Sequence, residues 1–137
     1  MIRFAFIALV ALALSAGSAF AQAKIEHGPI KNVNATDAKG MFASYCAVCH
    51  GTDGKGMGPA ASALAKAPAD LTRVSARNKG TFPDTRVRRY IEGLDEIAAH
   101  GSRDMPMWGS LFNSLNRDTA QLRIAALADY IKGMQVP

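Results

Sequence analysis

One short motif constrains this chain more than any other feature of its sequence. Both cysteines of the 137 residues stand in it, as Cys46-Ala47-Val48-Cys49-His50. Two cysteines that are separated by two residues and followed directly by histidine are typical of covalent haem attachment. At the end of a helix, this spacing places both sulfurs on one side, toward two vinyl groups of one porphyrin, and points the imidazole at the iron. We therefore expect one haem c, bound covalently by Cys46 and Cys49, with His50 as an axial ligand of the iron.

Other uses of a Cys-x-x-Cys pair require features that the sequence does not show. A thioredoxin-like redox pair requires a βαβ setting, and no segment has a strong strand pattern. A structural zinc site requires four ligands, and the remaining histidines, His27 and His100, are far apart in the chain. A single disulfide is the common fate of two cysteines in an exported protein. The histidine that directly follows Cys49 favours haem over all three.

The first 21 residues are typical of a secretory signal peptide. Met1-Ile2-Arg3 is a short positive head, residues 4–14 are continuously apolar, and small residues lead to Ala19-Phe20-Ala21. The apolar run is shorter than the roughly 20 residues that a membrane span needs. We expect cleavage after Ala21, with a retained anchor as the alternative. The mature protein is then exported, for example to the periplasm, and carries no membrane span.

The remaining sequence predicts an all-α domain of three to five short helices. Residues 22–34 show little periodicity and are interpreted as a flexible lead-in, followed by one domain over residues 35–135. Helical spacing of apolar residues, capping residues and glycine stops define the segments. They are a helix from Thr36 into the cysteine motif, a glycine-rich loop at 51–58, a helical turn at 59–66, helices at 71–76, 83–93 and 118–132, and an irregular loop at 101–109. Such long loops suggest that the haem itself serves as the core.

The iron has one position left opposite His50, and several side chains compete for it. Met105 is favoured because the proline after it keeps its backbone extended. It also lies 105 − 50 = 55 residues beyond His50, which leaves enough chain to pass round the ring. Met107 shares the loop and is the close competitor, whereas Met57 follows the motif too closely. His100 is a further alternative, because imidazole is an equally good ligand.

The charge balance favours a protein partner over nucleic acid. The chain has 16 Lys and Arg against 11 Asp and Glu, a net charge of +5. These residues are interleaved with apolar and acidic ones, and no nucleic-acid motif is present. The run Arg86-Val87-Arg88-Arg89 is interpreted as the solvated side of a helix. A mildly basic surface steers a protein toward an acidic partner or an anionic membrane.

Several further segments accompany the cysteine motif. They are Gly51 directly after the motif, Gly-Met-Gly-Pro at 56–59, Asp-Leu-Thr at 70–72, Phe-Pro at 82–83, Ile-Glu-Gly at 91–93, the stretch 100–109 with Met-Pro-Met-Trp at 105–108, and Ala-Asp-Tyr-Ile at 128–131. With them, residues 35–135 resemble the class I cytochromes c of bacteria that carry a single haem. The resemblance implies a cytochrome c fold in which short helices wrap around the haem.

The resemblance also implies roles for individual residues. The methionine before proline is the sixth iron ligand in this family, which selects Met105. The proline of the glycine-rich loop, here Pro59, offers its carbonyl to the proximal histidine and thereby orients His50. The C-terminal helix crosses the N-terminal one, often at a glycine eight residues before the first cysteine. Because this chain has Ala38 at that position and Gly40 two residues on, we expect the crossing to be wider or shifted.

Three functions are consistent with these features. The first is an electron carrier, not an enzyme, that shuttles single electrons between redox partners through a small transient interface at the haem edge. The second is a cytochrome subunit that accepts electrons within a dehydrogenase or oxidase complex. The third is a haem enzyme such as a peroxidase, although the two-haem kind would need a second Cys-x-x-Cys-His motif, which the sequence lacks.

Overall fold

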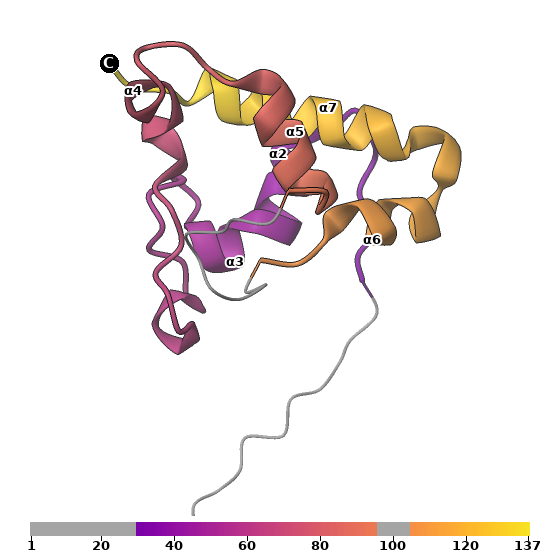
Figure 1. The fold of residues 1–137 in the computed structure, drawn as a ribbon. Helices are drawn as coiled ribbons and strands as arrows, with labels where there is room; N and C mark the ends of the chain where they lie inside the picture. Colours follow the sequence, from indigo (N-terminus) through magenta and orange to yellow (C-terminus); the bar gives the residue numbers. More distant parts are fainter. Residues whose placement is uncertain (1–29, 96–104) are drawn as a thin grey trace, which may run out of the picture. The chain divides into compact units, whose positions relative to one another are not determined.

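Three helical segments of different pitch follow one another without a break near the start of the described chain. They are α2 (Ala38–Met41), the π-helical η1 (Phe42–Cys46) and α3 (Ala47–His50) (Figure 1). The computed structural model describes residues 30–95 and 105–137. The predicted signal peptide at 1–21 and the alternative ligand His100 lie outside these ranges. The cap of this helical run is Asp37, which accepts a hydrogen bond from Gly40 N at 2.8 Å, and not the predicted Thr36.

The rest of the described chain is helical as well. After single turns at η2 (Ala61–Ala63), η3 (Leu71–Arg73) and α4 (Val74–Arg77), it forms α5 (Asp84–Glu92), α6 (Trp108–Leu115) and α7 (Arg117–Gly133). Every regular element in the described ranges is a helix, which confirms the all-α prediction. The predicted cap Asp70 starts η3 by accepting from Thr72 N at 2.9 Å. Gly93 ends α5 in the left-handed region, at φ 86°.

Helix α7 is the element against which α2, α5 and α6 pack (Figure 1). The predicted crossing of the N- and C-terminal helices is present, and the rings of Phe42 and Tyr130 meet there at 5.2 Å between centroids. On the α6 side, Phe112 is fully buried between Tyr45 and Trp108. The buried side chains of this core are Val33, Met41, Phe42, Tyr45, Cys46, Ala47, Val87, Ile91, Phe112, Ala120, Ile124, Leu127, Ala128 and Ile131.

Part of the predicted lead-in at 22–34 contacts the domain: Val33 is buried, whereas residues 31, 32 and 34 are exposed. Arg123 of α7, only 4% exposed, donates a hydrogen bond to the carbonyl of Val33. The hydroxyl of Tyr45 accepts from Val33 N at 3.2 Å. The compact unit therefore starts earlier than the sequence predicts, at residue 31. Val33 is bound by Tyr45 and Arg123, which belong to other elements. Contacts between separate elements produce no local periodicity that a sequence pattern can reveal.

The sequence pattern does not predict α6, because Gly109 ends the predicted loop at 101–109. In the structure Gly109 is buried inside α6, and a Cβ there would lie 2.6 Å from the carbonyl oxygen of Glu92. This glycine is needed because α6 packs closely on the end of α5, and it does not form a turn. Asn116 separates α6 from α7 and caps α7 by accepting from Asp118 N at 2.9 Å.

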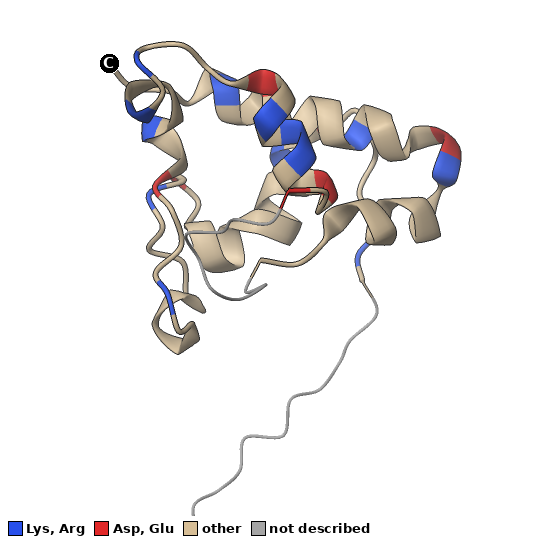
Figure 2. Ribbon diagram, viewed as in Figure 1, with Lys and Arg blue, Asp and Glu red and all other residues tan. Residues whose placement is uncertain are grey.

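Charged residues are distributed over several helices. Figure 2 shows Lys and Arg on α4, α5 and α7, with Asp or Glu among them on α5 and α7. The interpretation of 86–89 as a solvated helix face fits Arg86 and Arg89, which are exposed, while Val87 between them is buried. Across the described residues, no helix is long and apolar enough to span a membrane.

Candidate functional site

The predicted haem attachment residues share one turn of helix at the junction of η1 and α3. Cys46 ends the π-helical segment, and Cys49 and His50 follow in α3. Both cysteines are free thiols, with Cys46 buried and Cys49 half-buried. Short π-helical insertions are frequently found at functional sites, because they turn side chains relative to a regular helix. The local fold therefore brings two unpaired thiols and an imidazole together, as the motif predicts.

Burial disfavours the charged forms of Cys46 and His50. Burial, with a smaller contribution from the neighbouring Cys49, raises the pKa of the Cys46 thiol to about 12. Burial also lowers the pKa of His50, although its hydrogen bond to a backbone carbonyl opposes this shift. A histidine with a lowered pKa is neutral at neutral pH, which is the form that binds a metal.

The glycine-rich loop folds back onto the carboxyl end of α3. Backbone N–H groups of the loop donate to the last carbonyls of the helix: Gly56 to His50 at 2.7 Å and Gly58 to Cys49 at 3.0 Å. A Cβ on Gly58 would lie 2.5 Å from two carbonyl oxygens of α3. Helix ends leave such carbonyls without intrahelical partners. The loop thus serves as the cap of the motif helix, and its glycines are required by this close approach.

His50 is oriented by Ala69, so the prediction that Pro59 orients it is wrong. The Nδ1 atom of His50 lies 3.0 Å from the carbonyl oxygen of Ala69. Pro59 is exposed, and the backbone on both sides of it is occupied in capping α3. Because a carbonyl only accepts, Nδ1 must carry the proton, which leaves the lone pair of Nε2 for a metal. A backbone carbonyl has no sequence signature of its own; the neighbouring Asp70 cap was the only available signal.

The methionine side chains differ in their burial and in the residues that they contact. Met41 is fully buried under Arg123, and Met57 is 84% exposed. The sulfur of Met134 lies beside Gly54. The Cβ and Cγ atoms of Met107 lie against Gly93. A Cβ added to Gly93 would be 2.7 Å from each of them.

Met105 is half-buried and follows directly on the undescribed segment 96–104. The structure therefore brings Cys46, Cys49 and His50 together, and the place of Met105 opposite His50 stays a prediction.

These residues fit a covalently attached haem. The two thiols are unpaired, the imidazole is neutral, and its free nitrogen is fixed by the Ala69 bond. Among the described residues, no group of three or more His, Cys, Asp or Glu side chains is suited to hold a bare metal ion. The donor set of this turn is thus two thiols for porphyrin vinyl groups and one nitrogen for iron.

The helical fold and this turn define a c-type cytochrome domain. Residues 33–131, well over half of the chain, match the family described as cytochrome C oxidase, cbb3-type, subunit III. The chain belongs to this family, and its domain is a haem-binding electron-transfer domain. Comparisons with curated proteins and with solved structures gave no match.

Proposed function

We propose that this protein is an exported electron carrier with a single haem c. Cys46 and Cys49 form the thioether bonds, and His50 and Met105 are the axial ligands of the iron. The signal peptide at 1–21 directs the chain out of the cytoplasm, to the periplasm in a bacterium, and is then removed. The observation that carries this proposal is the helical turn with two free thiols and an imidazole fixed by the Ala69 carbonyl.

Each residue of the site has a defined task in this function. When bound, the haem supplies a one-electron ferric–ferrous couple. His50 donates through Nε2 with its ring held in one tautomer by Ala69. Met105 contributes a thioether sulfur, which favours ferrous iron and raises the reduction potential. With both axial positions taken by side chains, little rearranges when an electron moves, so this ligand set favours transfer over catalysis.

The positions of the other methionines support Met105 over Met107. The side chain of Met107 is already packed on Gly93 at the end of α5, while Met105 precedes it in the segment that leads away from α6. The Cβ and Cγ of Met107 would have to keep this close approach to Gly93 while its sulfur reached the iron.

A second candidate function rests on the family description. The name of the matching family refers to a subunit of an oxidase, so this chain is alternatively a cytochrome that accepts electrons within such a complex. A free shuttle and a subunit share the same site chemistry. They differ in the partner interface, which is small and transient for a shuttle and larger for a permanent subunit. Co-purification of the exported protein from its native membrane fraction separates them.

The iron ligands are tested on the purified protein after export. We expect a c-type haem spectrum that survives denaturation, because the thioether bonds are covalent, and a methionine–iron charge-transfer band in the ferric form. Met105→Ala abolishes this band and lets the reduced protein bind CO. Met57→Ala is the matched control, because Met57 is 84% exposed, and it leaves the band unchanged. If Met107→Ala removes the band while Met105→Ala keeps it, the ligand is Met107.

A further inference from the structure

The backbone on both sides of the Ala69 carbonyl is fixed by contacts with the glycine-rich loop and with Arg77. Leu71 N donates to the carbonyl of Gly54 at 2.7 Å. The backbone of Pro68 approaches Gly56 so closely that a Cβ on this glycine would collide with the Pro68 carbonyl. Arg77 donates from its guanidinium to the carbonyl of Asp70 at 2.7 Å. The peptide groups next to Ala69 therefore have little freedom to rotate.

On the C-terminal side, a single side chain joins this backbone to the end of α7. The Oε1 atom of Gln135 accepts from Ser75 N at 2.8 Å. Its Nε2 atom donates to two carbonyls, that of Leu71 at 2.7 Å and that of Ile131 at 2.8 Å. Both amide hydrogens and the amide oxygen are thus used, and the three partners define which way the amide faces.

We infer that Gln135 is a positioning residue of the haem site, which holds the Ala69 carbonyl against His50 from the far end of the chain. This inference rests on the proposed function. The path is short, because Gln135 binds the carbonyl of Leu71, and Leu71 is two residues from Ala69. The backbone N–H of Val136 adds a second anchor by donating to the carbonyl of Thr72 at 2.9 Å.

The hydrogen bond that Gln135 supports affects the iron through His50. A carbonyl that accepts from Nδ1 makes the imidazole a more basic ligand at Nε2. A more basic ligand stabilises ferric iron relative to ferrous iron. When the Ala69 carbonyl is free to turn away, the bond to Nδ1 lengthens, ferric iron loses this stabilisation and the reduction potential rises. The segment at the end of α7 thereby affects the reduction potential of the haem, although it supplies no ligand to the iron.

The test compares three variants of the exported, haem-loaded protein. Gln135→Ala removes all three hydrogen bonds. Gln135→Glu keeps the length of the side chain and an acceptor for Ser75 N, but as a carboxylate it has no hydrogen for Leu71 or Ile131. Gln121→Ala is the matched control, because Gln121 is an exposed glutamine of α7 whose amide donates to Glu92 at 2.9 Å, away from η3.

Two readouts distinguish positioning from mere stabilisation. The first is the exchange of the His50 Nδ1 proton with solvent in the ferrous protein, followed by NMR; we expect Gln135→Ala to speed it roughly tenfold, as expected when a local hydrogen-bonded unit is loosened. The second is the reduction potential, which we expect to rise by about 28 mV, corresponding to about a threefold change in the ferrous-to-ferric ratio of a one-electron couple. Gln135→Glu also raises the exchange rate and the reduction potential, and Gln121→Ala leaves both quantities unchanged.

Other outcomes overturn the inference in separable ways. If both Gln135 variants match Gln121→Ala in exchange and potential, Gln135 does not position the carbonyl, and the proposed function still stands. If they lower the melting temperature but leave both readouts unchanged, the role of Gln135 is structural only, and the inference is wrong. A wild-type protein that carries no haem would instead overturn the proposed function, and this inference with it.

Discussion

Two regions of this protein are stabilised in different ways. The helical layer, defined as α2, η1, α5, α6 and α7, has a core of large apolar side chains around Phe42 and Phe112. The loop arm, defined as residues 51–81 with η2, η3 and α4, has no buried apolar side chain. Its buried residues are Gly51, Gly54, Gly56, Gly58 and Thr72.

The difference indicates which region depends on the cofactor. Backbone hydrogen bonds to α3 and close contacts of its glycines with neighbouring backbone define the shape of the loop arm. Its Leu71 and Val74 pack against the core but are only partly buried. Such bonds contribute only about 0.5–1.5 kcal/mol each, net of water, and apolar burial is the dominant favourable contribution to folding. A region that buries little of its own apolar surface requires another apolar body to pack against, and the haem of a c-type cytochrome is such a body. The helical layer contains its own core.

The largest effect is expected from removing both thiols. Cys46→Ser combined with Cys49→Ser abolishes covalent haem, so no haem band remains on the polypeptide after denaturing electrophoresis. The protection of backbone amides from hydrogen exchange then falls unequally. Amides of the loop arm lose roughly tenfold or more of their protection, because locally stabilised units open first, while α6 and α7 retain the larger share. Equal loss in both regions would show that the helical layer is no more self-sufficient than the loop arm.

The next largest effect concerns the helical layer alone. Phe112→Ala removes a fully buried ring that contacts Tyr45 and Trp108. We expect the free energy of unfolding to fall by about 3–5 kcal/mol, measured by denaturant titration, because a cavity is left in the core. Leu122→Ala on α7 is the control; this side chain is 49% exposed, and its loss costs within about 0.5 kcal/mol. Similar values for the two variants would contradict the core assigned to this layer.

The same division explains what the sequence predicted well. Helices α5 and α7 have regular apolar spacing and clear end signals such as Gly93, so their existence follows from local patterns. The thiol–imidazole turn was predicted because its chemistry requires contiguous residues.

The failures concern contacts between distant segments. Gly109 resembled a loop residue because its packing partner, Glu92, lies on another helix. The carbonyl that orients His50 belongs to Ala69, and any residue type provides a carbonyl. The backbone of Val33 is bound by Arg123, far along the chain. A single sequence shows the preferences of each segment, but not which backbone group a distant side chain will meet.

A smaller effect tests how the loop arm is held together. The hydroxyl of Thr72 donates to the Asp70 carboxylate at 2.6 Å and is the main reason why the pKa of Asp70 is lowered. A carboxylate with a lowered folded-state pKa stabilises the protein above its ordinary pKa, and this stability is lost as the pH falls through the lowered value. Thr72→Val should therefore cost about 1 kcal/mol at neutral pH, reduced by solvent around Asp70, and little at acid pH.

The measurement is the free energy of unfolding as a function of pH for the wild type and for Thr72→Val. The two curves should converge as the pH falls below the ordinary range of aspartate. A constant gap at all pH values would mean that Thr72 acts by packing, and not through the charge of Asp70. Ser75→Ala is a suitable control, because Ser75 uses its backbone N–H, and not its hydroxyl, in the bond to Gln135.

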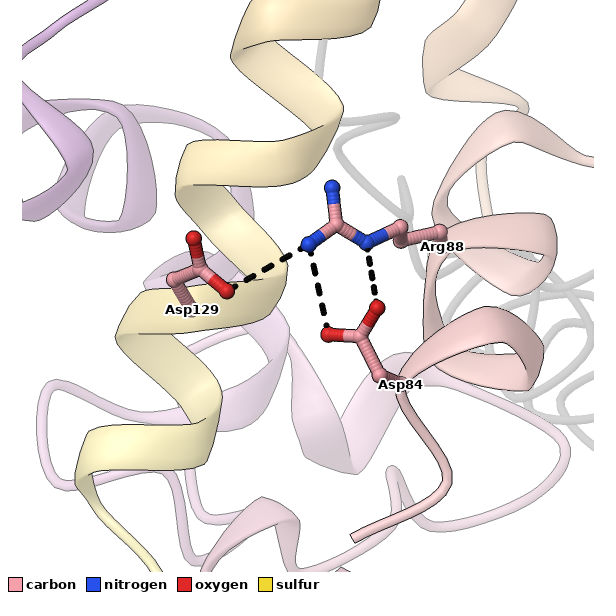
Figure 3. A network of polar contacts seen from close by, with 3 residues as sticks. All are labelled: Asp84, Arg88 and Asp129. Carbon is pink, nitrogen blue, oxygen red and sulfur yellow. Dashed lines mark hydrogen bonds and ion pairs between the residues drawn. The ribbon is translucent and has the colours of Figure 1, made fainter.

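The smallest effect belongs to the ion pairs on the surface of the helical layer (Figure 3). Arg88 of α5 contacts Asp84 of the same helix at 2.6 Å and reaches Asp129 of α7 at 3.4 Å, where the Asp129 side chain is 65% exposed. Exposed pairs of this kind contribute about 0.2–1 kcal/mol. A double-mutant cycle with Arg88→Met and Asp129→Asn, followed by denaturant unfolding, should give a coupling energy at the low end of this range.

High salt should reduce this coupling, because screening acts most strongly on exposed charges. The buried Val87 and Ile91 lie on the same helix and hold α5 in the core by apolar contact, so Ile91→Ala should cost several times more than either change of charge. A coupling energy above about 1 kcal/mol would exceed what an exposed pair provides. It would mean that electrostatics, and not the apolar core, docks α5 on α7, and the helical layer would then resemble the loop arm in depending on polar contacts.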